Sequence, residues 1–299
     1  MATKTEVKTA PRNEAGQELW LKIAARALIF AAEHLIRMKI EGTENLREAA
    51  DYVNSDQGGL LVTPNHNSYI DALLMDQVRK EVNPLKRFVV LWANKFTGKD
   101  QGKYAETGQE NMSRVLAAGK IGQEAARKVN IELIAVPQEA TDIASARKAV
   151  KFLELIGEEV LGNDNVLGVF PEGTRSRNGK LGEAKKALKY LFESPAVTDK
   201  TLILPIAITG TDQYLPPDKE KLNPLAKVSI IYGKPYTYAQ AKEEMKMFKL
   251  PLGDIMMWHI GRLLPKEKWG VYEEFFSTIQ NAQEKSTVRA LTDPLNTKI

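Results

Sequence analysis

NVLGVFPEGTRSRNGK, residues 165–180, joins an apolar run to a polar one at a single proline. The apolar run predicts a short buried strand, and Pro171 ends it because proline cannot donate to a strand ladder. Glu172 and Gly173 predict a turn, after which residues 174–177 place hydroxyl and guanidinium groups at the carboxyl end of the strand. Guanidinium groups bind phosphate in pairs of hydrogen bonds, and glycine lets backbone N–H groups approach an anion. The stretch therefore predicts an anion-binding turn, with a solvated connecting turn as the alternative.

The rest of the chain alternates strand patterns with helix patterns. Strands are expected at 60–63, 87–93, 131–136, 165–170, 202–210 and 227–235. Helices are expected at 71–82, 120–129, 142–161, 181–194, 239–248, 253–264 and 270–284. This alternation predicts an α/β fold with a mixed central sheet flanked by helices on both faces. Residues 97–114 lack periodicity and predict a long loop.

The two ends of the chain are expected to differ from its middle. Residues 1–16 predict a polar, disordered lead-in, and residues 17–40 predict an N-terminal amphipathic helix that is apolar around most of its circumference. Such a helix either packs in the core or associates with a membrane surface, where Trp20 and Phe30 would be anchors. Its cations would then face anionic headgroups: Lys22, Arg26, Arg37 and Lys39. Residues 41–272 are expected to form the globular domain, and residues 273–299 a C-terminal helix and tail.

The composition narrows the classes of function. The 299 residues carry a net charge of +4, which is too weak to predict binding of nucleic acid but suits anionic small molecules or a membrane surface. The absence of cysteine excludes disulfides, thiolate nucleophiles and cysteine-ligated metals. The sequence has no secretory signal and no uninterrupted apolar run long enough to predict a transmembrane helix.

His66 has the most informative setting of the histidines. The stretch TPNHNSYID, residues 63–71, places it just after a strand, where α/β proteins position groups that face a ligand. A turn could fold Asp71 back onto the imidazole, fix its tautomer and leave the other ring nitrogen to accept a proton from a hydroxyl. The alternative is that Asp71 or Ser68 only caps the following helix.

Together the two stretches resemble the signature of the glycerolipid acyltransferase family, whose best-known members are the 1-acyl-glycerol-3-phosphate acyltransferases. The motif N-H-x-S-x-x-D is matched by Asn65, His66, Ser68 and Asp71, and F-P-E-G-T-R-S is matched by every residue of 170–176. Further similar segments are IEGTENL (40–46), LPIAITG (204–210), YGKP (232–235) and LLPKEKWGVY (263–272). The resemblance extends over about residues 17–272 and implies an acyltransferase domain over 41–272.

The resemblance implies transfer of a fatty acyl group from acyl-CoA or acyl-carrier protein to lysophosphatidic acid, with no metal or prosthetic group. His66 would be the general base and Asp71 would orient it. The expected substrate-binding residues are Asn65, Ser68, Lys95, Glu172, Gly173, Thr174, Arg175 and Ser176, of which residues 172–175 would hold the acceptor phosphate. The resemblance also implies a peripheral or monotopic enzyme on the cytoplasmic face of a membrane, attached through residues 17–40.

One position departs from the family pattern. The family usually has an arginine just after the strand between the two motifs, where this chain has Pro137 and Gln138. Arg147, Lys148 and Lys95 are candidates to replace it. The acceptor could therefore also be glycerol 3-phosphate or another lysolipid, such as a lyso-ornithine lipid. A non-catalytic lipid-binding protein and a hydrolase are the alternatives from other classes.

Overall fold

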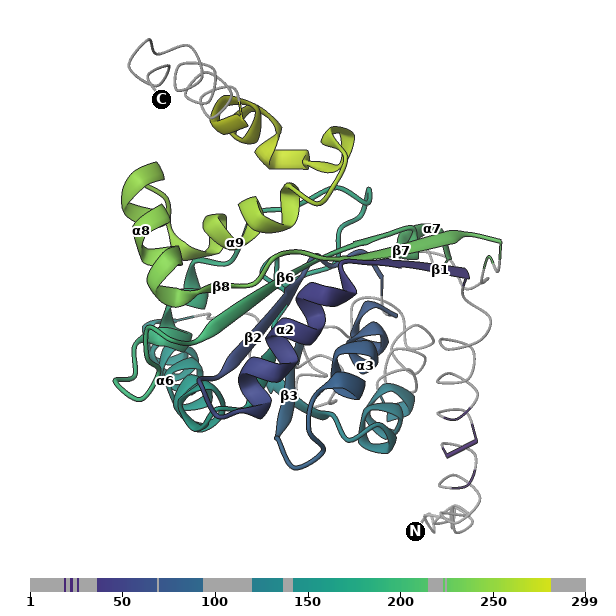
Figure 1. Ribbon diagram of the computed structural model, residues 1–299, viewed down its shortest axis with the longest axis horizontal. Helices are drawn as coiled ribbons and strands as arrows, with labels where there is room; N and C mark the ends of the chain where they lie inside the picture. The colour runs from purple at the N-terminus through teal and green to yellow at the C-terminus, as the bar shows by residue number, and fades with distance from the viewer. Residues whose placement is uncertain are drawn as a thin grey trace, which may run out of the picture.

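The computed structural model describes residues 37–68, 70–93, 120–136, 142–214, 223 and 225–280, and the single positions 19, 22, 23 and 26. Its centre is an eight-stranded sheet with helices on both faces (Figure 1). The strands are β1 (Arg37–Glu41), β2 (Leu60–Pro64), β3 (Phe88–Ala93), β4 (Glu132–Val136), β5 (Val166–Gly168), β6 (Leu202–Thr209), β7 (Lys227–Tyr232) and β8 (Tyr236–Thr237).

The helices cover the sheet and connect its strands. The α-helices are α2 (Thr43–Asn54), α3 (Asp71–Glu81), α6 (Ile143–Val160), α7 (Thr211–Tyr214), α8 (Tyr238–Phe248) and α9 (Leu252–Gly261). Short 3₁₀ helices are η3 (Leu161–Asn163), η4 (Lys186–Phe192), η5 (Lys266–Lys268) and η6 (Gly270–Tyr272). Residues 120–128 and 273–280 are also helical. No described helix has both the length and the apolar character that a membrane span needs.

The order of the strands brings the two sequence motifs to one end of the sheet. The strands lie in the order β1-β7-β6-β2-β5-β3-β4, with β8 beside β6. Strand β2 is parallel to both of its neighbours, β5 and β6, whereas β6 and β7 are antiparallel. The sheet is therefore mixed, as predicted. Because β2 and β5 run in the same direction, the segments that follow them leave the sheet at the same edge.

The two faces of the central strands bury different cores. Leu60 and Val62 of β2 point into a core with α2 and α3, and Leu61 points into a second core with α6, η4 and α9. Every residue of β2 and β5 is buried. Strands that are covered on both faces have continuous apolar sequences, which is why these strands were predictable.

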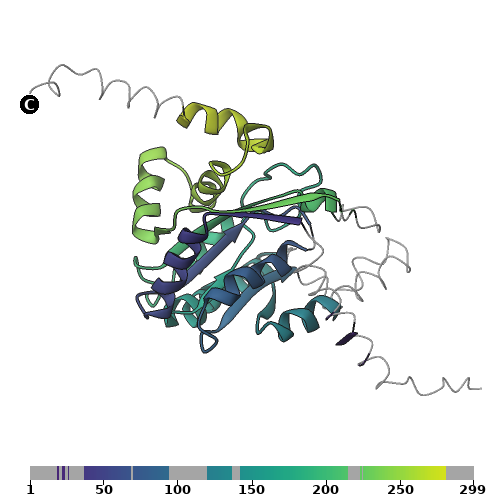
Figure 2. The same ribbon diagram turned by 45° about the vertical axis from the view of Figure 1, so that its right-hand side comes forward.

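The C-terminal elements support the segment that follows the second motif. Figure 2 shows α8, α9 and the helix at 273–280 gathered at one side of the sheet. Trp258, Trp269 and Phe276 form the centre of their core. The backbone N–H of Leu181 donates to the carbonyl of Lys268 at 2.9 Å, and Val271 N–H donates back to the carbonyl of Leu181 at 3.2 Å.

Two predicted elements are wrong in part. The end of the expected N-terminal helix, residues 37–40, belongs to β1, which pairs in parallel with β7. The helix expected at 181–194 is a 3₁₀ helix and begins only at Lys186. Contacts of Gly182 and Lys185 with residues of the second motif hold the chain extended before it. Helix α2 was not predicted. The predictions for residues 1–36, 97–114 and 281–299 lie outside the described residues, apart from the four single positions.

Candidate active site

His66 and Asp71 lie side by side at the carboxyl end of β2. Nδ1 of His66 is 3.0 Å from Oδ2 of Asp71, and the histidine side chain is 17% exposed whereas the aspartate is fully buried. The same oxygen accepts the backbone N–H groups of Asn67 at 2.6 Å and Ser68 at 2.7 Å. The predicted contact is therefore confirmed. Because Nδ1 faces the carboxylate, Nε2 is the ring nitrogen that does not contact Asp71.

The alternative role of Asp71 or Ser68 as a helix cap is wrong. Helix α3 has Ile70 at its N-cap and no side-chain cap. Asp71 instead accepts hydrogen bonds from residues that precede the helix, so its carboxylate shapes the loop that carries His66. Its position in the first turn of α3 also suits a negative charge, because the helix dipole is positive there.

The second motif holds His66 from the other side. The imidazole stacks on the ring of Phe170, with centroids 4.0 Å apart and an interplanar angle of 25°. Ser176 N–H donates to the carbonyl of His66 at 2.7 Å, and the N–H of His66 donates to Oε1 of Glu172 at 3.0 Å. The two motifs thus form one site although they are far apart in the sequence.

Glu172 is the buried link between the two motifs. Its Oε1 accepts from the backbone of His66, and its Oε2 accepts from the N–H of Gly182 at 2.9 Å. Burial, with a smaller contribution from the charge of Asp71, raises the pKa of Glu172 to about 7 against the lowering effect of both hydrogen bonds. Because both oxygens face backbone donors, we interpret Glu172 as a positioning residue, although the sequence led us to expect contact with a phosphate.

Asn65, another predicted substrate-binding residue, is 2% exposed and fully engaged with β6. Its Nδ2 donates to the carbonyl of Ile208 at 2.9 Å, and the N–H of Ile208 donates to its Oδ1 at 2.7 Å. Nδ2 of Asn67 donates to the same carbonyl at 2.8 Å. These amides attach the loop to the sheet. Sequence reasoning missed Asn67, which occupies an unspecified position of the motif N-H-x-S-x-x-D.

The turn at 173–176 presents its polar groups on the surface. Gly173 has a φ of 62°, which requires glycine or strain, and a Cβ there would lie 2.8 Å from Cγ of Lys185. Thr174 is exposed and Arg175 is partly buried. Ser176 is buried, and its hydroxyl accepts the N–H of Lys180 at 3.0 Å. Within the predicted set, Thr174 and Arg175 therefore have side chains that reach the solvent.

One remaining candidate, Lys95, lies outside the described residues, and so do Pro137 and Gln138, where the chain departs from the family pattern. Arg147 and Lys148 are exposed on α6. Among the described residues, no three histidine, aspartate or glutamate side chains come together as a set of metal ligands.

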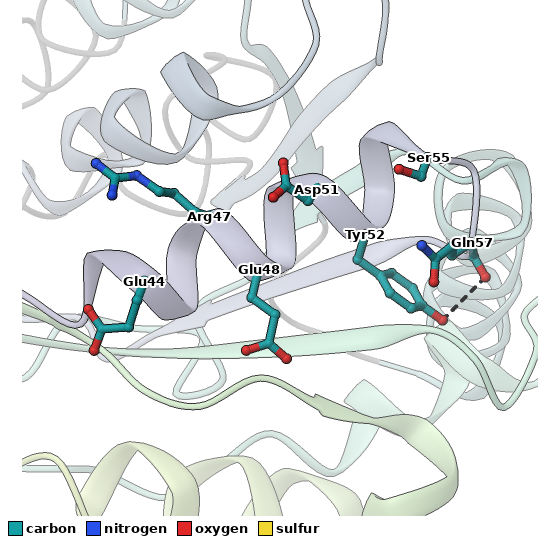
Figure 3. A pocket seen from close by; sticks show the side chains of 7 residues that line it. All are labelled: Glu44, Arg47, Glu48, Asp51, Tyr52, Ser55 and Gln57. Atoms are coloured by element: carbon teal, nitrogen blue, oxygen red, sulfur yellow. Dashed lines mark hydrogen bonds between the residues drawn. The ribbon is translucent and has the colours of Figure 1, made fainter.

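A hollow on the outer face of α2 is separate from these residues. Figure 3 shows its lining, which consists of Glu44, Arg47, Glu48, Asp51, Tyr52, Ser55 and Gln57. The hydroxyl of Tyr52 lies 3.2 Å from the carbonyl of Gln57 and 2.8 Å from that of Lys200. These contacts attach the end of α2 to a neighbouring loop, and the hollow contains no residue of either motif.

The described site combines an oriented imidazole with a turn that carries hydroxyl and guanidinium groups. The comparisons with known proteins agree with this chemistry. A protein-family model described as Acyltransferase matches residues 37–209, a range that contains both motifs and more than half of the chain. A search of curated proteins found no match. The chain therefore belongs to the acyltransferase family and is a transferase of acyl groups.

Proposed function

We propose that the chain transfers a fatty acyl group from a thioester to the free hydroxyl of 1-acyl-glycerol 3-phosphate, giving phosphatidic acid. The observation that carries the proposal is the contact between His66 and Asp71 at 3.0 Å, held against the turn at 172–176 through Glu172. This contact supports the proposal of a general base beside groups that suit a phosphate. A lysophospholipid supplies both a hydroxyl and a phosphate within one small headgroup.

His66 carries the proton during the transfer. Its Nε2 accepts the proton of the acceptor hydroxyl while the hydroxyl oxygen attacks the thioester carbonyl. The carbon–sulfur bond then breaks, and the departing thiolate takes the proton back from the imidazolium. Asp71 stabilises the imidazolium between these steps. The chain has no cysteine, and the acyl group passes directly from the donor to the acceptor.

The turn binds the acceptor, and this binding provides rate enhancement beyond that of the general base. A positioned general base contributes roughly 10²–10⁴-fold to the rate, so alignment of the two substrates must provide much of the remainder. The Thr174 hydroxyl and the Arg175 guanidinium are the groups that we assign to the acceptor phosphate. Binding this phosphate fixes the distance between the acceptor hydroxyl and His66.

The activity is tested with purified full-length protein, labelled acyl-CoA and a panel of acceptors. The panel contains lysophosphatidic acid, glycerol 3-phosphate and a lyso-ornithine lipid, because Pro137 and Gln138 depart from the family pattern. We expect labelled phosphatidic acid from the first acceptor and a near-background signal from His66→Ala. Release of free fatty acid without an acceptor would show a hydrolase, and product from another acceptor alone would replace the proposed substrate.

We also propose that the enzyme works as a peripheral or monotopic protein on the cytoplasmic face of a membrane. Its substrate is a lipid, and Leu19 and Ile23 of the segment 17–40 are 60% and 58% exposed. Because β1 begins at Arg37, the deletion that tests this attachment should stop at residue 36. We expect the shortened protein to lose co-sedimentation with anionic liposomes. Unchanged co-sedimentation would contradict the proposal.

A further inference from the structure

The segment that follows the motif turn has an unbalanced surface charge. Between residues 177 and 189 it carries five exposed cations against one exposed carboxylate, Glu183; the cations are Arg177, Lys180, Lys185, Lys186 and Lys189. No carboxylate among the described residues lies within ion-pair distance of any of them. Elsewhere several exposed cations are paired, as Lys246 is with Glu243 at 2.8 Å. Like charges that are left together on a surface repel one another, and a bound anion would relieve that repulsion.

The 3₁₀ geometry of η4 aligns the lysines. Residues three apart in a 3₁₀ helix lie directly above one another with a rise of about 2 Å per residue, so Lys186 and Lys189 begin about 6 Å apart on one line. Leu188 and Leu191 point the other way into the core. Nζ of Lys189 also lies 4.8 Å from the ring centroid of Tyr190, and this contact leaves the lysine exposed.

Lys185 connects this row to the active site. Its backbone N–H donates to the carbonyl of Pro171 at 2.8 Å. Its side chain passes beside Gly173, because a Cβ on that glycine would lie 2.8 Å from Cγ and 3.0 Å from Cε of the lysine. A row of positive charge therefore starts at the motif turn and continues along η4.

We propose that Lys185, Lys186 and Lys189 bind the phosphate groups of coenzyme A when it delivers the acyl group. This is a second anion site, next to the one at 173–176 that receives the acceptor phosphate, and it rests on the proposed function. The long pantetheine arm of coenzyme A separates its thiol from its phosphates. A thioester can therefore reach His66 while the nucleotide end lies on η4.

The composition of the surface favours coenzyme A over an acidic carrier protein. A stable protein interface buries roughly 1,000 Å² or more and has an apolar or aromatic centre. The large exposed apolar side chains among the described residues lie elsewhere, at Leu19, Ile23, Ile40, Leu85, Ile143, Leu155, Leu225, Met247 and Val271. Three exposed ammonium groups, with the partly buried ring of Tyr190 as their aromatic neighbour, suit a small ligand with several phosphates.

The test compares two double variants of the full-length protein. Lys186→Gln with Lys189→Gln removes two charges from the row and keeps long polar side chains. Arg47→Gln with Lys80→Gln removes two charges from α2 and α3, which cover the opposite face of the sheet. Binding of coenzyme A alone is measured by calorimetry at low and high salt. We expect the first pair to weaken binding about tenfold at low salt and the control pair to leave it unchanged.

Activity assays extend the test to the donor. For the Lys186 and Lys189 pair we expect the KM for acyl-CoA to rise, with the KM for lysophosphatidic acid and the kcat unchanged. Unchanged coenzyme A binding in this pair would overturn the site, even in an active enzyme. A loss of activity with acyl-carrier protein but not with acyl-CoA would overturn it as well. Weakened coenzyme A binding in a protein without transferase activity would support the site and contradict the proposed function.

Discussion

The loop at 65–71 and the turn at 173–177 lie at the same end of the sheet, yet their polar groups are used differently. Asn65, Asn67 and Asp71 are buried and bonded to other parts of the protein. Thr174 and Arg177 are exposed. The comparison separates residues that stabilise the site from residues that are exposed to a ligand. Buried contacts hold His66 in place, whereas the exposed groups are those that we propose bind the ligand.

The strongest way to break this contrast is Asp71→Asn, which alters the centre of the buried loop. A neutral amide cannot stabilise the imidazolium, and its NH₂ group competes for the positions of the backbone donors. We expect kcat to fall about 10²–10⁴-fold with little change in the KM for the acceptor. Steady-state kinetics measure this effect. The matched control is Asp76→Asn on the same helix, where the carboxylate pairs with Lys80 at 2.8 Å. Equal losses in both variants would contradict a specific role for Asp71.

Glu172→Gln tests the link between the two regions through pH. The pKa of Glu172 is about 7 in the folded protein against an ordinary value of 4.5, so the folded state holds more protons between these values. The contribution of Glu172 to stability is therefore lost as pH rises from 4.5 to 7, by about 3 kcal/mol in total. Urea unfolding measures the free energy of unfolding at pH 5 and at pH 8. We expect its decrease between these pH values to be smaller in Glu172→Gln than in the wild type. The same decrease in the variant and the wild type would assign the pH dependence to another group.

Asn65→Ala tests whether the first motif is structural where it meets β6. The substitution removes two of the three side-chain hydrogen bonds to the Ile208 backbone and leaves the one from Asn67, and we expect it to lower the free energy of unfolding by about 1–3 kcal/mol. Urea unfolding at one pH measures the loss. Asn163→Ala is the control, because its amide bonds only carbonyls at the exposed end of α6. An Asn65→Ala protein of unchanged stability with a raised KM for the acceptor would show that Asn65 binds the substrate and is not a structural residue.

Thr174→Val tests the exposed turn and should have the smallest effect of these substitutions on stability and activity. The side chain is exposed, so we expect the free energy of unfolding to change by less than about 0.5 kcal/mol. Loss of the hydroxyl should raise the KM for lysophosphatidic acid a few-fold and leave kcat unchanged. A lower kcat at an unchanged KM would place Thr174 in the chemical step.

The sheet could be predicted because its central strands are buried on both faces and have continuous apolar sequences. Helix α2 could also have been predicted from the sequence, because its buried residues repeat at helical spacing: Leu46, Ala49, Ala50 and Val53. The 3₁₀ form of η4 could not have been predicted, because contacts with distant residues hold the preceding chain extended. Strand β1 was missed for a similar reason: its partner β7 lies almost two hundred residues away in the sequence.

The candidate site also contains contacts that could be predicted from the local sequence and contacts that could not. The contact between His66 and Asp71 follows from local spacing, and the sequence predicted it. The role of Glu172 depends on the register between β2 and β5, which no local pattern contains. A motif written as one line of residues does not distinguish its buried members from its exposed members. Only the packing of Glu172 beneath the turn and of Thr174 on its surface separates them.

The bond between His66 and Glu172 also has a consequence for synthesis of the protein. The two residues are 106 positions apart, and Gly182 completes the clamp. A nascent chain that has left the ribosome only as far as β4 carries the complete first motif and its local bonds to Asp71, but it lacks Glu172 and Gly182. Assembly of the site must wait for the pairing of β2 with β5, a contact of high sequence separation that forms slowly. The two motifs therefore form one site only after the chain has been synthesised beyond Gly182 and these segments have folded together.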